Sequence, residues 1–180
     1  LSDRDRSRED VKVQYEYWEK RNRRLQLKGR QFIDFTLVDS LGKEKKISDY
    51  IGKYKLLFLD FWASWCAPCR AQEPHLFRLY QKYRDKDFGI LGISLDASKT
   101  SWLSILQKKE NLWPNLCIIN KEDEKCIREL YCITGIPFGV LIDKSGKIVD
   151  VVNVGWQHLE MILNEYYKAN NGDSCKNGDL

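Results

Sequence analysis

Two long, mostly apolar runs, residues 55–62 and 88–95, constrain the fold more than any other feature of the sequence. A strand that is apolar at nearly every position is buried on both faces, which is typical of a parallel sheet covered by helices. Residues 67–84 lie between the two runs and place Leu76, Leu79 and Tyr83 on one helical face. The three segments therefore predict a strand, a crossover helix and a second, parallel strand.

The alternation of strand and helix patterns continues along the chain. Residues 33–37 alternate apolar and polar side chains, as a half-buried strand does. Beyond residue 95 the patterns predict helices around 102–106, 126–131 and 159–166, and strands at 116–119, 138–142 and 147–153. The last two strands flank a turn signal at residues 143–146 and predict a hairpin. This order predicts an α/β fold with a mixed central sheet and helices on both faces, because parallel crossovers need helices and the hairpin adds an antiparallel edge.

Length and charge limit the classes of function. A chain of 180 residues with 43% apolar residues predicts one domain with short additions. Residues 1–30 hold ten lysines and arginines against six acidic residues, which accounts for the net charge of +4. Residues 31–180 are neutral, so we expect no nucleic-acid partner. No apolar run approaches the roughly 20 residues that span a bilayer, and the charged N-terminus is unlike a signal peptide.

The two ends of the chain differ from its body. Residues 1–30 predict a charged amphipathic helical extension, in which Val11, Tyr15, Trp18 and Leu25 fall near a seven-residue repeat. We expect this helix to pack on the domain or to fray from it. A coiled coil or a partner-docking helix is the less favoured alternative, because a stable coiled coil needs about three heptads. Residues 170–180 carry no apolar pattern and predict a loose tail.

Cys66 and Cys69 follow directly after the run 55–62 and are separated by two residues. Such a pair is either redox-active or half of a zinc site. The remaining cysteines contain no second closely spaced pair, and the chain has two histidines. These other residues are Cys117, Cys126, Cys132 and Cys175, with His75 and His158. A zinc site is poorly supplied with ligands, so we expect redox chemistry, no metal and no cofactor beyond the cysteine pair.

The order of the two cysteines on the predicted helix assigns their roles. Cys66 lies at the first turn, where backbone N–H groups and the positive end of the helix dipole favour the thiolate, so it is the candidate nucleophile. Cys69 lies one turn further in, between helix and core, and is the candidate resolving thiol. Pro68 suits the first helical turn, where its missing N–H has no intrahelical partner.

The segment around these cysteines, residues 59–70 with the sequence LDFWASWCAPCR, resembles the active-site segment of thioredoxins. Ala67-Pro68 is similar to the Gly-Pro dipeptide of reducing thioredoxins. Pro74 resembles the proline within the family's active-site helix, and Ile136-Pro137 resembles its cis-proline. The resemblance covers residues 31–169 and implies a thioredoxin-like three-layer sandwich with an extra N-terminal hairpin.

A narrower resemblance is to the periplasmic or membrane-anchored thioredoxin-like reductases, including those of cytochrome c maturation and those of Bacteroidetes. It is carried by residues 35–37, 42–43, 48–50, 52–54 and 94–96. It implies a location in the periplasm or cell envelope, a disulfide-containing protein substrate, and a thiol electron donor linked to the membrane. Those reductases usually carry a glutamate where this chain has Gln72, and Glu73 follows one position later, turned by about 100° around the helix; the alternative is that a helix bent at Pro74 brings Glu73 inward to fill the same role. We expect that carboxylate to be absent here.

The resemblance extends the candidate site beyond the cysteines. Asp60, six residues before Cys66, is the expected base for the Cys69 proton, because burial raises the pKa of a carboxylate; the alternative is a residue that caps a turn. Residues of the expected substrate-binding surface are Trp65, Ala67, Pro68, Ile136 and Pro137. Trp65 is expected at the rim and Trp62 in the core, while His75 is expected to be exposed.

Three functions remain in competition. The favoured one is a monomeric thiol-disulfide oxidoreductase that reduces protein disulfides through a mixed disulfide on Cys66. A peroxiredoxin-like peroxide reductase would require threonine three residues before the reactive cysteine, where this chain has Ala63. A non-catalytic binding module of the same fold is disfavoured by the intact cysteine pair. Among the other cysteines, Cys117 and Cys126 are expected in the core, and pairings among all four stay open.

Overall fold

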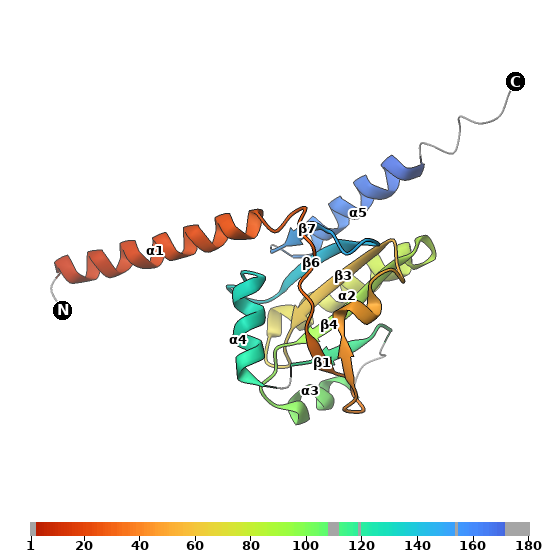
Figure 1. Ribbon diagram of the computed structural model, residues 1–180, viewed down its shortest axis with the longest axis horizontal. Helices are drawn as coiled ribbons and strands as arrows, with labels where there is room; N and C mark the ends of the chain where they lie inside the picture. The colour runs from red at the N-terminus through yellow and green to blue at the C-terminus, as the bar shows by residue number, and fades with distance from the viewer. Residues whose placement is uncertain (1–2, 108–111, 119, 154, 172–180) are drawn as a thin grey trace, which may run out of the picture.

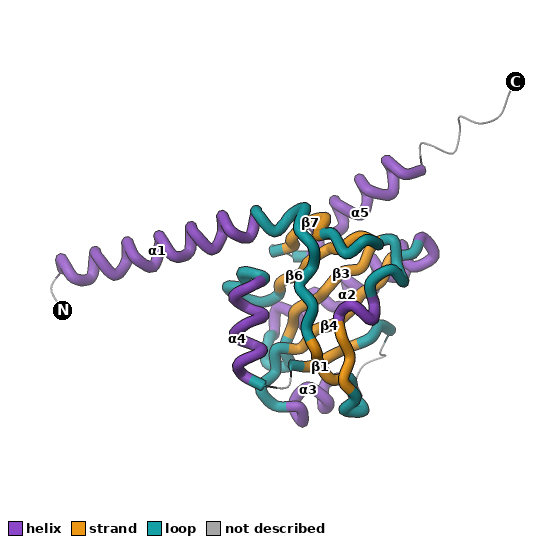
Figure 2. Tube along the Cα trace, viewed as in Figure 1, coloured by secondary structure: helices purple, strands orange, loops and turns teal. Residues whose placement is uncertain are grey.

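The computed structural model describes residues 3–107, 112–118, 120–153 and 155–171, and its centre is a seven-stranded sheet with the order β2-β1-β5-β4-β3-β6-β7. The strands are β1 (Thr36–Val38), β2 (Glu44–Lys46), β3 (Leu56–Trp62), β4 (Phe88–Ser94), β5 (Asn115–Cys117), β6 (Phe138–Asp143) and β7 (Ile148–Val152). The helices are α1 (Asp3–Leu25), α2 (Ala67–Tyr83), α3 (Lys99–Leu106), α4 (Lys121–Leu130) and α5 (Trp156–Asn171), with short 3₁₀ turns at Ile47–Tyr50 and Arg84–Lys86. Figures 1 and 2 show this arrangement.

The sheet is mixed, as the sequence predicts. β3 pairs with β4 in parallel and with β6 in antiparallel, and every residue of β3 and β4 is buried. The predicted hairpin is formed by β6 and β7. In its turn, the Asp143 carboxylate accepts hydrogen bonds from the backbone N–H and hydroxyl of Ser145, and Gly146 has a φ of 85°, a conformation that favours glycine.

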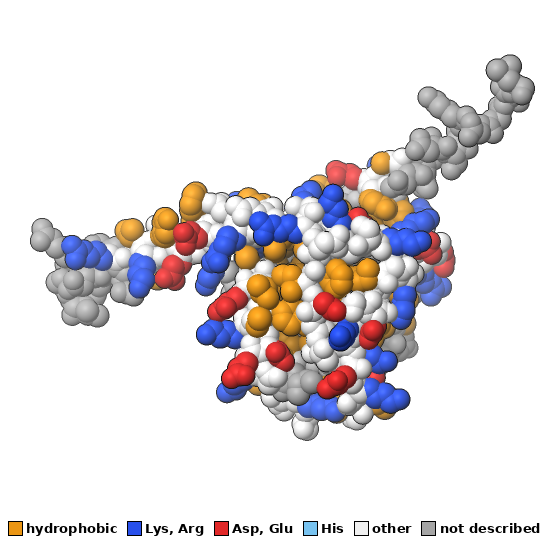
Figure 3. Space-filling model, viewed as in Figure 1, with side chains coloured by type: hydrophobic (Ala, Val, Ile, Leu, Met, Phe, Trp, Pro, Cys, Tyr) orange, Lys and Arg blue, Asp and Glu red, His pale blue; other side chains and the backbone are white. Residues whose placement is uncertain are grey.

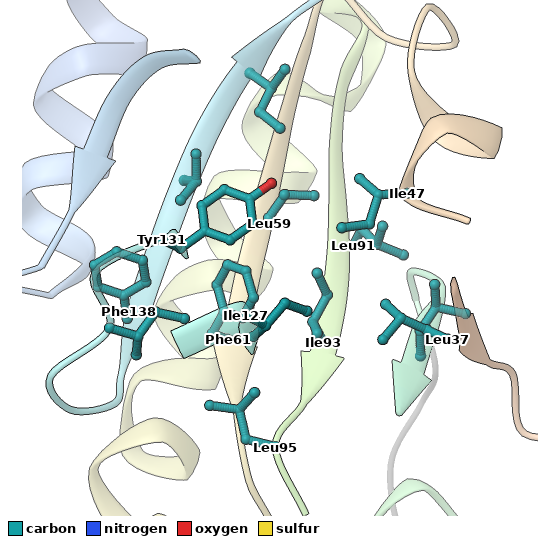
Figure 4. Packing of buried hydrophobic residues seen from close by; sticks show 14 of the residues in the cluster. Leu37, Ile47, Leu59, Phe61, Leu91, Ile93, Leu95, Ile127, Tyr131 and Phe138 are labelled. Atoms are coloured by element: carbon teal, nitrogen blue, oxygen red, sulfur yellow. The ribbon is translucent and has the colours of Figure 1, made fainter. Parts of the chain in front are cut away.

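The alternation of side chains along β3 divides the core into two layers. Leu57, Leu59 and Phe61 point into one layer, which includes Ile127 from α4 and Tyr131 (Figure 4). Leu56 and Phe58 point into the other layer, where α2 and α5 cover the sheet through residues Leu76, Leu79, Leu159 and Leu163. Helices therefore cover both faces, which confirms the predicted three-layer sandwich.

The N-terminal hairpin is present but begins later than predicted. The alternation at residues 33–37 predicts a strand from Ile33, whereas β1 starts at Thr36 and pairs with β2 and β5. The backbone N–H of Ile33 donates to the Tyr131 hydroxyl over 2.9 Å, and that hydroxyl donates to the Ile33 carbonyl over 2.8 Å. The Tyr131 side chain thus makes the hydrogen bonds to the Ile33 backbone that a neighbouring strand would otherwise make.

The two terminal helices project from the sandwich in different directions (Figure 1). The side chains of residues 11–21 on α1 are all exposed, and contact with the domain begins at Arg24 and Leu27, which are buried. α5 continues to Asn171, so the first residues of the predicted tail are helical, and residues 172–180 lie outside the described part. Among the described helices, none combines the length and the apolar character that a bilayer crossing needs.

Candidate active site

Cys66 is the N-cap residue of α2, and a disulfide joins it to Cys69 in the first turn, with 5.3 Å between the two Cα atoms. β3 ends at Trp62, and a short loop then brings the chain into the helix, where the Cys66 N–H donates to the Ala63 carbonyl over 3.0 Å. The pair therefore lies at the carboxyl end of a buried central strand.

The sulfur of Cys66 takes the place that a serine or aspartate oxygen takes at most helix starts. The backbone N–H of Cys69 donates to Cys66 Sγ over 3.2 Å, and Pro68 occupies the first turn. An N–H donor and the positive end of the helix dipole both stabilise negative charge. When the disulfide is reduced, this position therefore favours the thiolate of Cys66 over that of Cys69.

Burial does not distinguish the two sulfurs, because Cys66 is 3% and Cys69 5% exposed. They belong to an apolar cluster that contains Trp62, Ala63, Trp102, Leu106 and Cys117. Trp62 is buried there as predicted, whereas Trp65 is 62% exposed. Ala67 and Pro68 are also exposed, so the surface around the disulfide is formed by these three residues.

The structure brings the distant Ile136-Pro137 segment to this site. The peptide bond between the two residues is cis, as the resemblance implies, and Ile136 packs against the cluster that holds both cysteines. Pro137 and Gln72 line the same small hollow, together with Trp156 from α5. The side chain of Gln72 therefore faces the cis-proline side of α2.

Asp60 is 7% exposed and lies within β3, where it pairs in register with Gly139 of β6 and Gly92 of β4. Strand alternation places its side chain on the same face of the sheet as Phe58, which is the face covered by α2. The carboxyl group is therefore buried beneath the helix that carries both cysteines.

Asp96 is a second buried carboxylate near the cysteines, and the sequence did not predict it as a site residue. It is 4% exposed and accepts hydrogen bonds from the Ser64 N–H over 2.8 Å, the Ser64 hydroxyl over 2.6 Å and the Ser94 hydroxyl over 2.7 Å. Ser64 lies two residues before Cys66, so Asp96 fixes the loop that precedes Cys66. Ser94, the last residue of the buried strand β4, and Asp96, two residues later, form the polar pair in the sequence that could have identified it.

The remaining cysteines differ in environment. Cys117 is buried as predicted, and its thiol donates to the Asp96 carbonyl over 3.8 Å; burial raises the pKa of this thiol. Cys126 is exposed, which makes the core prediction wrong, because α4 turns Ile127 toward the sheet. Cys117, Cys126 and Cys132 are free thiols, whereas Cys175 lies outside the described residues.

His75 is half-buried rather than exposed, because its ring stacks on Trp156 of α5 with 4.1 Å between centroids. The sequence carried no signal for this contact between helices. In the described part of the chain, no group of three or more His, Cys, Asp or Glu side chains is placed to hold a metal ion.

Comparison with known proteins identifies the fold and the chemistry. Residues 52–148 match the model of a thioredoxin-like family. The thiol-disulfide oxidoreductase ResA of Bacillus thuringiensis is 31% identical over 140 residues, which cover 78% of this chain and 76% of that protein. ResA of Geobacillus kaustophilus is also 31% identical, over 66% of this chain and 65% of its own length.

Solved structures agree with these sequence matches. The thioredoxin domain of a thiol-disulfide oxidoreductase from Bacteroides vulgatus has a TM-score of 0.68 at 29% identity, covering 77% of this chain and 96% of that domain. A thiol:disulfide interchange protein from a Bacteroides species has a TM-score of 0.70 at 28% identity, covering 84% and 97%. With the Cys66–Cys69 disulfide at the start of α2, the chain belongs to the thioredoxin-like family and is a thiol-disulfide oxidoreductase.

Proposed function

We propose that this oxidoreductase works in the reducing direction, with Cys66 as the nucleophile that opens disulfides in other proteins. The observation that supports Cys66 as the nucleophile is the hydrogen bond from the Cys69 N–H to Cys66 Sγ at the N-cap of α2. A sulfur held there has a stabilised thiolate, which is both the attacking form and the better leaving group. The reducing direction is supported by the Ala67-Pro68 dipeptide, which is similar to that of reducing thioredoxins.

The reaction runs in two exchanges. The Cys66 thiolate attacks one sulfur of the substrate disulfide, forms a mixed disulfide, and releases the other sulfur as a thiolate that takes up a proton. Cys69 then loses its proton to the Asp60 carboxylate and attacks Cys66 Sγ, which releases the second substrate thiolate. The substrate gains two electrons and two protons, and the Cys66–Cys69 disulfide must be reduced again by a thiol electron donor.

The substrate segment binds next to the cis-proline. In this proposal, the backbone of Ile136 pairs with an extended peptide that carries the disulfide, in the manner of an added strand. Trp65, Ala67 and Pro68 form the surface that contacts the peptide around Cys66, and all three are exposed. Pro137 follows Ile136 in a cis peptide bond, and Ile136 packs against the cluster that holds both cysteines.

The similar proteins support a proposal for the cellular compartment in which the reaction takes place. The similar proteins include ResA enzymes and a DsbE-type thiol:disulfide interchange protein from Chlorobium tepidum, at a TM-score of 0.65 and 28% identity. We assign the chain to the periplasm or cell envelope, with a membrane-linked thiol donor, no nucleic acid and no separate cofactor. Disulfides formed during cytochrome c maturation are the proposed substrate class.

A trapping experiment tests the division of labour between the cysteines. Cys69→Ser should accumulate mixed disulfides with a model protein disulfide such as insulin, because the resolving thiol is gone, whereas Cys66→Ser should trap none. In the reduced wild type, iodoacetamide at neutral pH should label Cys66 before Cys69. Faster labelling of Cys69 would reverse the assignment.

The reduction potential of the Cys66/Cys69 couple tests the direction. A value near the roughly −270 mV of thioredoxin supports a reductase, and a value near the roughly −120 mV of a strong oxidant contradicts it. Equilibration against glutathione and thioredoxin, followed by mass spectrometry of the two active-site thiols, measures this potential without knowledge of the natural substrate.

A further inference from the structure

An apolar seam runs along α1 with no covering partner in the described structure. It consists of Val11, Tyr15, Trp18 and Leu25, which are 65%, 58%, 59% and 71% exposed. Asn22 fills the remaining position, so that the spacing is four, three, four and three residues, the repeat of a two-stranded coiled coil. The rings of Tyr15 and Trp18 stack with 6.3 Å between centroids.

The seam cannot be covered by the domain of its own chain. Arg24 is the α1 residue buried against the domain, where its guanidinium donates to the Cys132 carbonyl over 3.1 Å and to the Thr134 hydroxyl over 2.8 Å. Lys20 lines the groove between α1 and α4. Arg24 follows Asn22 by two residues, and Lys20 follows Trp18 by two residues. Two residues correspond to about 200° around a helix, so both side chains lie opposite the seam. Figure 3 shows hydrophobic side chains along the upper edge of the projecting helix, away from α4.

We propose that α1 pairs in antiparallel with α1 of a second copy of this chain. In an alignment centred between Tyr15 and Trp18, the Tyr15 ring of one copy meets the Trp18 ring of the other. Lys12 and Glu19 flank the seam on one side. Antiparallel pairing places Lys12 beside Glu19 of the second copy twice, once at each end of the interface.

A parallel pair would not have this charge match. In parallel register the flanking residue opposite Lys12 is Ser7 of the second copy, and the one opposite Glu19 is Gln14, so neither charge finds an opposite charge. The antiparallel pair also sends the two catalytic domains to opposite ends of the interface, so that they do not collide.

The amount of exposed apolar surface indicates a weak dimer. Aromatic side chains bury roughly 150–250 Å² each. With the exposed fractions given above, pairing two seams would bury about 1,000 Å² of apolar surface in total. Specific interfaces begin at about this size. Asn22 weakens the pair further, because it meets Val11 of the second copy. We therefore expect an association that depends on concentration in the micromolar range.

Sedimentation velocity of the full 180-residue chain tests the proposal. The runs cover about 1 to 500 µM and contain a reducing agent, so that no dimer arises through the exposed thiol of Cys126. The wild type should shift from monomer to dimer across this range. Trp18→Ser should raise the dissociation constant at least about tenfold, whereas Tyr17→Ser, which removes a 56% exposed ring from outside the seam, should leave it unchanged. Asn22→Leu should lower it.

Charge reversals test the antiparallel orientation. Lys12→Glu and Glu19→Lys should each weaken the dimer about threefold or more, and the double variant should restore it. Insulin reduction by every variant should match the wild type, because the substituted residues precede Arg24 on the projecting part of α1 and belong to no part of the proposed catalytic site. A chain that stays monomeric to 500 µM overturns the proposal, as does a dimer that Trp18→Ser leaves intact. A double variant no better than the single ones overturns the orientation.

Discussion

Two buried carboxylates outside the cysteine motif lie beside the helix and the loop that carry Cys66. Asp60 lies beneath α2, and Asp96 holds the loop before Cys66 through Ser64. The two have different tasks: one is the proposed proton acceptor, and the other positions backbone. A substitution at Asp60 therefore tests the proton transfer, and a substitution at Asp96 tests the stability of the loop.

Asp60→Asn should slow the second exchange and leave the first nearly unchanged. The amide has almost the same size as the carboxyl group but cannot accept the Cys69 proton. Stopped-flow measurement with a fluorescent disulfide substrate should show normal formation and slow decay of the mixed disulfide between pH 6 and 9. Unchanged decay over that range would reduce Asp60 to a structural residue.

Asp96→Asn should destabilise the protein by about 1–3 kcal/mol, because the carboxylate accepts two hydrogen bonds from Ser64 and one from Ser94. Urea unfolding of the oxidised protein measures this change. Asp85→Asn is the matched control, since its side chain is 87% exposed. Equal stability of both variants would show that the Asp96 hydrogen bonds do not hold the loop.

At the scale of the elements, local sequence patterns predicted most of the fold. β3 and β4 follow from their nearly continuous apolar runs, and α2 follows from its helical periodicity. The β6–β7 turn follows from its Asp-Lys-Ser-Gly signal. The failures arise from contacts between distant segments. β1 starts late because the Tyr131 hydroxyl takes the backbone of Ile33, and His75 is half-buried because α5 supplies Trp156.

The candidate site was predictable only in part for the same reason. Cys66, Cys69 and the cis bond before Pro137 follow from recognisable motifs. The role of Asp96 depends on how β4 lies beside the loop at Ser64, which no spacing in the sequence encodes. Cys126 was misplaced because a ten-residue helix gives little evidence for the direction of its buried face.

The pairing of β6 with β3 requires glycine at position 139. A Cβ atom there would lie 2.1 Å from Phe58 Cζ and 3.2 Å from the Leu59 carbonyl oxygen. Gly139→Ala should therefore destabilise the protein by about 1–3 kcal/mol, measured by urea unfolding. Gly135→Ala is the control, because nothing lies within 4 Å of its added atom. Similar stability of the two variants would contradict the close packing described for β6.

At the scale of the whole molecule, we expect two buried tyrosines to lower the stability of the fold at alkaline pH. Burial raises the pKa of Tyr131, and burial also raises the pKa of Tyr167, above the ordinary tyrosine value of about 10. A raised pKa means that the folded state holds the proton more tightly, so this stabilisation is present below about pH 10 and is lost as the pH rises above it. The free energy of unfolding should fall between pH 9.5 and 11. Tyr131→Phe should be less stable at pH 8, where it loses two hydrogen bonds to Ile33, but should show a shallower fall; an equally steep fall contradicts this assignment.

The segment between α1 and the first strand closes one side of the sheet. Gly29 N–H donates to the Ile148 carbonyl, Ile148 N–H donates to the Arg30 carbonyl, and Gln31 forms a bridge with Lys147. Without residues 1–31, part of β7 would present unpaired backbone groups to solvent, as an open edge does. The opposite edge, β2, is three residues long and carries Glu44, Lys45 and Lys46, which discourage pairing. A chain shortened to the catalytic body would therefore expose part of β7 to pairing with a strand of another molecule, which residues 29–31 prevent by occupying that edge.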